Sequence, residues 1–97
     1  MNEEITPKIG MGATEIMGTD RYPFTIIQIA SKNRLIVQAD KYSAIGTNTA
    51  NNQNYEYKPD KNGKIEKLIL TKYGWKILGE PVYFKIGYRK AFYDWSF

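Results

Sequence analysis

Turn-forming residues divide this chain into short apolar segments, and this division constrains the fold more than any other feature. Residues 18–21, 59–63 and 79–81 carry Gly, Pro, Asn or Asp in combinations typical of tight turns. None of the segments between the turns has the length and periodicity of an amphipathic helix. Six or seven short strands at this spacing predict an all-β domain, either a small antiparallel barrel or a compact sandwich.

The strands can be placed from their apolar residues and flanking turns. Residues 24–31 are rich in Ile and predict a strand buried over much of its length. Lys32-Asn33 predicts a two-residue hairpin, in which Asn33 tolerates the left-handed conformation. Residues 41–53 are polar, so we expect a surface loop there, of a length that is often functional. The expected strands are residues 13–17, 24–31, 34–41, 54–58, 64–72, 75–78 and 82–89.

Length and residue types limit the classes of function. Ninety-seven residues make one domain, which we assign to residues 10–97 after a flexible lead-in at residues 1–9. The absence of His and Cys excludes the usual nucleophilic systems and the usual zinc ligands. Asp20 and Asp40 lie at strand ends, where carboxylates more often cap turns than act together in catalysis. We therefore expect a protein that is not an enzyme, with no catalytic residue, cofactor or metal site.

Charge and terminal sequence indicate a compartment and a range of partners. The net charge of +4 suits nucleic acid, a nucleotide or an acidic protein surface. Six lysines between residues 58 and 76, against Asp60 and Glu66, account for the whole of that excess, and a solvated, protective face explains them better than a phosphate site. The start, MNEEITPK, is acidic where an export signal is basic, and no apolar run reaches membrane-spanning length. We expect a cytoplasmic protein without membrane contact.

The most aromatic part of the chain is its C-terminus. Seven of the fifteen residues in 83–97 are aromatic. A free tail of this composition would be poorly soluble, so most of it must pack. Residues 83–86 fit the core of a strand, and the last residues fit a lid over one end of a barrel. Tyr88, Arg89 and Tyr93 remain as a candidate surface where aromatic rings lie beside positive charge.

A second candidate surface pairs scarce arginine with tyrosine. Arg21 can hold a phosphate or carboxylate through two hydrogen bonds, and Tyr22 can stack on a planar ligand. Tyr55 and Tyr57 fall on one face of a strand. The alternative is that Asp20 pairs with Arg21 and that the tyrosines are half-buried with their hydroxyls in water. The candidate ligand-binding residues are Arg21, Tyr22, Tyr55, Tyr57, Tyr88, Arg89 and Tyr93.

Two patterns resemble known groups of proteins. Residues 20–27, Asp-Arg-Tyr-Pro-Phe-Thr-Ile-Ile, with the hairpin and strand that follow, resemble the start of SH3-like and Tudor-like barrels. That resemblance implies an SH3-like barrel, although no aromatic cage of the methyl-lysine-reading kind is traceable. The layout from Gly10-Met11-Gly12 to the aromatic C-terminus is similar to that of small uncharacterised proteins of bacteriophages and prophages. It implies a viral context, and it transfers no site residues.

Two classes of function follow from these observations. The first is a non-enzymatic, phage-type binding protein that sequesters a nucleotide-like or nucleic-acid ligand in the host cytoplasm, with a counter-defence role. The alternative is a protein-binding inhibitor or assembly module that docks on a host protein through its aromatic C-terminus and strand edges. The sequence leaves the oligomeric state open, and a homodimer would bury aromatic surface that so small a domain exposes.

Overall fold

The computed structural model of the chain describes residues 5–46, 54–89 and 91–92. Within these ranges the chain contains strands and no helix. The strands are β1 (Gly12–Met17), β2 (Asp20–Ser31), β3 (Arg34–Ala39), β4 (Lys41–Ala44), β5 (Tyr55–Lys58), β6 (Ile65–Thr71), β7 (Gly74–Ile77) and β8 (Tyr83–Ile86).

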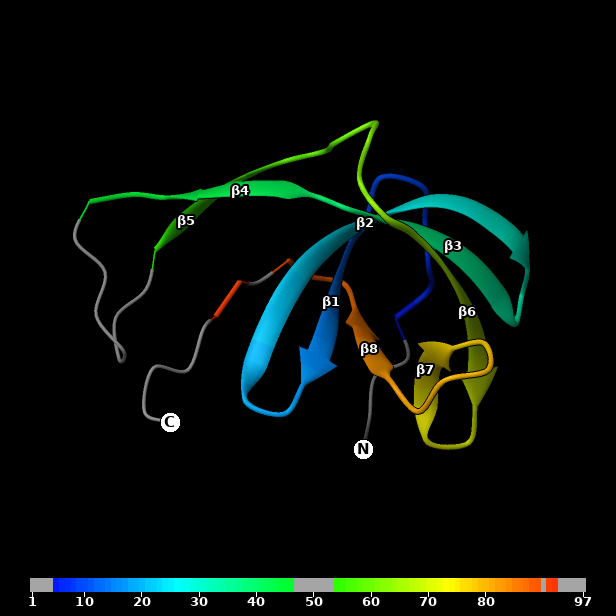
Figure 1. The fold of residues 1–97 in the computed structure, drawn as a ribbon. Coiled ribbons are helices and arrows are strands. Elements are labelled where there is room, and N and C mark those ends of the chain that lie inside the picture. The colour runs from blue at the N-terminus through cyan, green and yellow to red at the C-terminus, as the bar shows by residue number, and fades with distance from the viewer. Residues whose placement is uncertain (1–4, 47–53, 90, 93–97) are drawn as a thin grey trace.

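Six of the strands form a closed antiparallel barrel (Figure 1). Their order is β1-β2-β3-β6-β7-β8, and β8 pairs back onto β1. The all-β prediction is therefore confirmed, and a barrel is the architecture. Closure matters for a domain of this size because it leaves none of the six strands with an unpaired edge.

The barrel interior is filled by alternate residues of the six strands. Val37 and Leu68 are 0% and 1% exposed. Phe24 and Phe84 meet edge to face, with ring centroids 4.9 Å apart. Burial of such side chains is the main source of stability in a small barrel, at roughly 25 cal/mol per Å² of apolar surface. The core therefore spans β2, β3, β6 and β8, which are far apart in the sequence.

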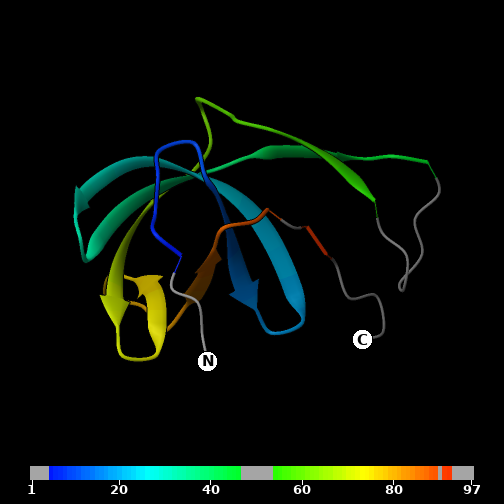
Figure 2. The ribbon, with the colours of Figure 1, turned by 180° about the vertical axis from the view of Figure 1, so that it is seen from behind.

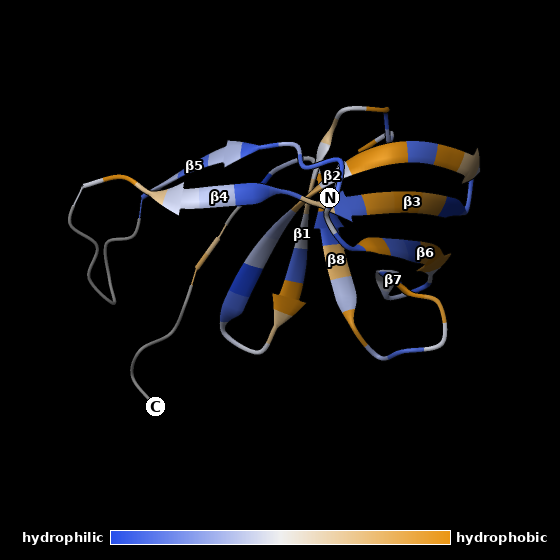
Figure 3. Cartoon of the chain, turned by 45° about the horizontal axis from the view of Figure 1, so that its top comes forward, coloured by the Kyte–Doolittle hydropathy of each residue, from blue (hydrophilic) through white to orange (hydrophobic). Residues whose placement is uncertain are grey.

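The strand β2 is longer than the sequence predicts, and its second half leaves the core. Its register against β3 shifts between Ile26 and Gln28 and again between Ile29 and Ser31. Such bulges bend a strand and increase its twist. Ile27 and Ile29 are consequently 38% and 39% exposed, so the prediction of burial over most of residues 24–31 is wrong beyond Ile26. Figure 3 shows the apolar colour running along this part of β2.

The hairpin between β2 and β3 is confirmed, but its turn differs from the expectation. Only glycines among the described residues have positive φ, so Asn33 does not take the left-handed conformation. Strands β5, β6 and β7 lie close to their predicted positions. The predicted strand over residues 82–89 ends early, at Ile86, because Gly87 bends the chain with a φ of 106°.

The strands β4 and β5 form a separate two-stranded ribbon, which we call the arm. The arm leaves the barrel directly after β3 and extends to the side of the β1–β2 hairpin, as both Figures 1 and 2 show. The prediction of a surface loop over residues 41–53 is therefore wrong for Lys41–Ala44, which is β4. The side chains of β4 give no apolar strand pattern in the sequence, because a ribbon that projects from the core has no fully buried face. Residues 47–53 of the predicted loop lie outside the described residues.

No helix in residues 5–46, 54–89 and 91–92 has the length and apolar character needed to cross a membrane.

Truncation of Leu68 measures how much the barrel depends on its core. We expect Leu68→Ala to lower the free energy of unfolding by about 2–5 kcal/mol, because it leaves a cavity among well-packed side chains. Leu70→Ala in the same strand is the matched control, since Leu70 is 42% exposed, and it should cost under about 1 kcal/mol. Denaturant unfolding checks both values, and equal losses would contradict the core described here.

Candidate functional site

The root of the arm is held by an ion pair between a buried carboxylate and a partly exposed guanidinium. Asp40 joins β3 to β4, and its side chain has no exposed surface. Arg89 Nε lies 3.0 Å from Asp40 Oδ2. Arg89 Nη2 also donates to the carbonyl of Gly10 at 2.9 Å and to Thr25 Oγ1 at 3.1 Å, while Thr25 donates to the second oxygen of Asp40. A carboxylate buried this deeply requires such partners, so these contacts fix the point from which the arm leaves the barrel.

Close backbone packing holds the segment that carries Arg89. A Cβ atom on Gly12 would lie 2.6 Å from Arg89 Cγ and 2.9 Å from the Arg89 backbone nitrogen. Only glycine permits this approach. The fully buried Thr14 donates a hydrogen bond to the carbonyl of Tyr88 at 2.8 Å, and the Gly87 amide donates to the Gly12 carbonyl at 2.8 Å. The chain after β8 is thus attached along the outside of β1.

Ala91 and Phe92, which follow Arg89 in the chain, connect the arm to β2. The amide of Ala91 donates to the hydroxyl of Tyr57 in the arm at 2.9 Å. Phe92 forms an antiparallel bridge with Arg21, with backbone hydrogen bonds of 2.8 and 2.9 Å. This segment therefore links β5 to β2 across the space between the arm and the barrel. The orientation of the arm is set at its root by Arg89 and along its length by Ala91.

One side of the arm is lined with tyrosine. Tyr42 pairs with Tyr57 in the register of β4 and β5, so the two side chains share a face, and Tyr55 follows on that face two residues from Tyr57. The rings of Tyr42 and Tyr55 meet edge to face, with centroids 5.4 Å apart. Tyr22 of β2 is near this face, because Tyr42 contributes to the raised pKa of the Tyr22 hydroxyl. We call Tyr22, Tyr42, Tyr55 and Tyr57 the tyrosine face.

Two hydroxyls of the tyrosine face are harder to ionise than usual. Burial raises the pKa of Tyr22, and the carboxylate of Asp20, which accepts its hydrogen bond at 3.4 Å, raises it further. Burial also raises the pKa of Tyr55, with smaller contributions from Tyr42 and Tyr57. Both hydroxyls therefore stay protonated at neutral pH; the proton of Tyr22 is donated to Asp20, and its oxygen can still accept a hydrogen bond.

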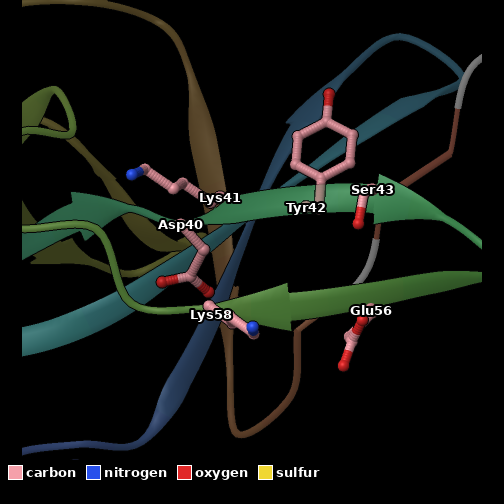
Figure 4. A pocket seen from close by; sticks show the side chains of 6 residues that line it. All are labelled: Asp40, Lys41, Tyr42, Ser43, Glu56 and Lys58. Carbon is pink, nitrogen blue, oxygen red and sulfur yellow. The ribbon is translucent and has the colours of Figure 1, made fainter.

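The other side of the arm is charged and borders a pocket of about 490 Å³. Lys41 pairs with Lys58, and Ser43 pairs with Glu56, in the register of β4 and β5. Figure 4 shows the Tyr42 ring pointing away from Ser43 and Glu56, as alternation along a strand requires. The pocket is lined by Asp40, Lys41, Tyr42, Ser43, Glu56 and Lys58. Tyr42 thus belongs both to the tyrosine face and to the rim of this pocket.

The structure brings some of the predicted ligand-binding residues together and separates others. Tyr22, Tyr55 and Tyr57 belong to the tyrosine face. Arg21 adjoins it in β2, where its Nη1 donates to the carbonyls of Gly18 and Asp20 at 2.8 Å.

The C-terminal candidates are placed differently. Arg89 uses its guanidinium within the fold, so its described contacts are structural. Tyr88 is 42% exposed, and its carbonyl is held by Thr14. Tyr93 lies outside the described residues.

Tyr42, Lys41 and Lys58 are the site residues that the sequence prediction omits, and Tyr42 is the one that a pattern could have revealed. Its segment carries no strand signal by itself, because Lys41–Ala44 has one aromatic and no aliphatic side chain larger than Ala. The signal that would have identified it is the match between two alternating tyrosine-containing segments, residues 41–44 and 54–58, on either side of a run rich in Asn. Such a pair predicts a hairpin, and the hairpin would have placed Tyr42 opposite Tyr57.

Glu15 and Lys64, the other two described groups with a shifted pKa, lie on the barrel and not on the arm. Burial raises the pKa of Glu15 above its ordinary 4.5; the positive charge of Lys64 opposes the shift, and the carboxylates of Glu66 and Glu80 add to it. Lys64 itself forms an ion pair with Glu66, with a distance of 2.8 Å between Nζ and Oε1. Among the described residues, no cluster of three or more Asp or Glu could hold a metal ion. The charges of these carboxylates therefore act on one another and on Lys64 in the barrel, and not on the arm.

Comparison with known proteins found no matching family model, no similar curated protein and no similar solved structure.

Removal of the Arg89 charge tests the root of the arm. We expect Arg89→Gln to lower the free energy of unfolding by about 3–5 kcal/mol, since it leaves the Asp40 carboxylate buried without its cation. Lys41→Gln is the control, because Lys41 is 70% exposed and lies 3.9 Å from Asp60, and it should cost under about 1 kcal/mol. Denaturant unfolding measures both. Equal small losses would show that the ion pair does not hold the arm.

The raised pKa of Glu15 gives a pH dependence of definite sign. The folded state binds the Glu15 proton more tightly than the unfolded chain does, so this residue's contribution to stability falls as pH rises through the window above 4.5. We expect Glu15→Gln to raise the melting temperature at pH 8 and to change it little at pH 4. Thermal denaturation at the two pH values measures this difference. A loss of stability at pH 8 that exceeds the loss at pH 4 would contradict the assignment.

Proposed function

We propose that this chain is a non-enzymatic binding protein whose arm takes up a nucleotide-like ligand. The base would stack on the tyrosine face, and the phosphate would lie between Lys41 and Lys58. The observation that carries the proposal is the cross-strand pairing of these two lysines next to Tyr42. A planar, phosphorylated ligand is the chemical class that uses both features at once.

The lysine pair supports an anionic ligand. Like charges directly opposite one another in a two-stranded ribbon destabilise it. Lys41 has a distant carboxylate in Asp60 at 3.9 Å, and Lys58 has no ion-pair partner in the described part of the chain. A phosphate placed between the two ammonium groups would replace repulsion with two charge-assisted hydrogen bonds. Such binding weakens as salt concentration rises.

The tyrosine face supports a planar ligand. Tyr42 is 42% exposed, and the contact with Tyr55 fixes the orientation of its ring. Stacking of a base on an aromatic side chain contributes about 1–3 kcal/mol and tolerates any base, since every base has a π face. Tyr42 lines the pocket as well, but its ring points away from Ser43 and Glu56, so a ligand stacked on this ring would reach the lysines around the edge of the arm. The hydroxyl of Tyr22, whose own proton is donated to Asp20, would accept a hydrogen bond from the base or the sugar.

Arg21 offers a second anion contact beside Tyr22. Its Nη1 is held by two carbonyls, and its Nε and Nη2 have no hydrogen-bond partner within residues 5–46, 54–89 and 91–92. A guanidinium oriented in this way is suited to grip a phosphate. A ligand with more than one phosphate, or a short single strand, would use both the lysine pair and Arg21.

The contacts of Asp20 and Asp40, the two carboxylates considered for catalysis, fit a protein that binds its ligand without catalysing a reaction. Asp40 is neutralised by Arg89, and Asp20 accepts the hydrogen bond of Tyr22. We propose sequestration as the role, in which the protein lowers the free concentration of its ligand. A counter-defence role in a host cytoplasm would follow if the resemblance to bacteriophage proteins reflects origin, since a small binding protein can act by removing a signalling nucleotide.

A protein-binding module is the second candidate, and one observation favours it. Within the described part of the chain, β4 and β5 pair only with each other, so each has one unpaired edge. A partner strand can add to such an edge through main-chain hydrogen bonds. In this case the tyrosine face would provide side-chain contacts to a host protein.

A ligand panel with a matched pair of tyrosine variants tests the proposal. Mono-, di- and cyclic nucleotides and a short oligothymidylate are screened by thermal shift, and the best ligand is measured by calorimetry. We expect Tyr42→Ala to weaken its binding about 5- to 150-fold, which corresponds to the loss of one stacking contact. Tyr73→Ala is the control, because Tyr73 is 75% exposed in the β6–β7 turn and should leave affinity unchanged.

Two results would overturn this function. One is the absence of a shift with every member of the panel at millimolar concentration, together with a stable protein partner in a pulldown. The other is an equal effect of Tyr42→Ala and Tyr73→Ala, which would place binding elsewhere. Lys58→Gln adds a separate readout, since it should reduce the salt dependence of binding as well as the affinity.

A further inference from the structure

A second pocket lies on the side of the barrel away from the arm. It has a volume of about 210 Å³ and lies between the end of the β2–β3 hairpin, β6 and the turn after β7. Its apolar wall includes Leu35, Leu68 and Leu78. In Figures 1 and 2 the β2–β3 hairpin and the arm project to opposite sides of the barrel, so this pocket is independent of the proposed nucleotide site.

The wall of this pocket is built from well-held residues. Leu35 and Leu68 are register partners in β3 and β6, and each is 1% exposed. The backbone amide of Leu78 donates to the carbonyl of Lys67 at 2.9 Å, which attaches the turn after β7 to β6. The two register shifts in β2 bend that strand at this end of the barrel. The opening is therefore part of the fold, and not a gap next to one mobile side chain.

The apolar surface continues outside the pocket. Ile29, the register partner of Leu35, is 39% exposed, and Leu78 is 48% exposed. The two charged residues of the lining, Arg34 and Lys67, are both cations, and neither Asp nor Glu lines the pocket. Neither cation forms a side-chain hydrogen bond or ion pair within the described part of the chain. An apolar cavity with only positive charge at its rim complements a molecule with an aliphatic chain and an anionic head.

We infer that this pocket binds a small amphipathic carboxylate, with its aliphatic chain against the exposed Leu78 and Ala30, above the buried Leu35 and Leu68, and its carboxylate at Arg34 and Lys67. An apolar cavity of roughly 150 Å³ holds benzene, so the volume here suits a short aliphatic chain and excludes a lipid with two chains. The guanidinium of Arg34 is the group suited to bind a carboxylate through two hydrogen bonds. The ammonium of Lys67 adds a second positive charge.

Methyl NMR with three eight-carbon probes tests this inference on the full chain. Octanoate, octanol and octylamine are titrated separately below their aggregation limits at neutral pH. We expect the methyl signals of Leu35, Leu68 and Leu78 to move with octanoate, and octanoate to bind about tenfold more tightly than octanol, as a charge-assisted contact provides. Octylamine, which is protonated at this pH, should bind most weakly.

Two variants separate the head-group contact from the apolar contact. The double variant Arg34→Gln/Lys67→Gln should abolish the preference for octanoate while affinity for octanol stays unchanged. Leu78→Asn should weaken all three probes, and Leu70→Asn is its control, because Leu70 is similarly exposed and does not line the pocket. Both positions are on the surface, and an amide spectrum of each variant verifies the fold.

The inference fails if octanoate moves no methyl signal of the pocket at millimolar concentration. It also fails if the three probes bind equally, because the cations would then have no role. A loss of octanoate binding in Leu70→Asn as large as that in Leu78→Asn would place the ligand elsewhere on the barrel. None of these results depends on the nucleotide panel, so the two proposals stand or fall separately.

Discussion

The contact of Arg89 with the buried carboxylate of Asp40 is the constraint on which the rest of this structure depends. Asp40 is the residue at which the chain leaves the barrel to form the arm, and Arg89 follows the last barrel strand. Their ion pair therefore ties the end of the chain to the root of the arm. A buried carboxylate without its cation is strongly unfavourable, so the pair restricts both segments to one arrangement. The short segment after Arg89 then reaches Tyr57 and Arg21.

This arrangement gives the polar ribbon the defined orientation that a binding site needs. A two-stranded ribbon alone in water is marginally stable, and the contacts at its root and at Tyr57 give the arm a defined orientation. Its register then sorts the side chains into a tyrosine face and a charged face, with Tyr42 at the border of both. Preorganised aromatic and cationic groups bind with less loss of entropy than flexible ones. The physical role of Arg89 in such a protein is to position the site.

The sequence predicted most strands of the barrel because these strands carry their own signals, and it left the choice between a barrel and a sandwich open. Ile-rich β2 and β3, the turn at residues 59–63 and the bend at Gly87 all follow from local residue preferences. Strand β4 was missed because it is polar and is stabilised by pairing with β5, which Ala91 in turn contacts through Tyr57. The role of Arg89 was equally hidden, since Asp40 is 49 positions away and only the closed barrel brings the two together. Long-range contacts between polar residues leave no periodic pattern in a sequence.

The most direct measurement of the central claim is an NMR titration of ADP into protein with isotopically labelled tyrosine rings. The claim is that the tyrosine face of the arm stacks on a planar, phosphorylated ligand. We expect the ring signals of Tyr22, Tyr42, Tyr55 and Tyr57 to move together and saturate, while the signal of Tyr73 in the β6–β7 turn stays in place. Movement of Tyr73 without the tyrosine face, or no movement of any ring at millimolar ADP, would contradict it.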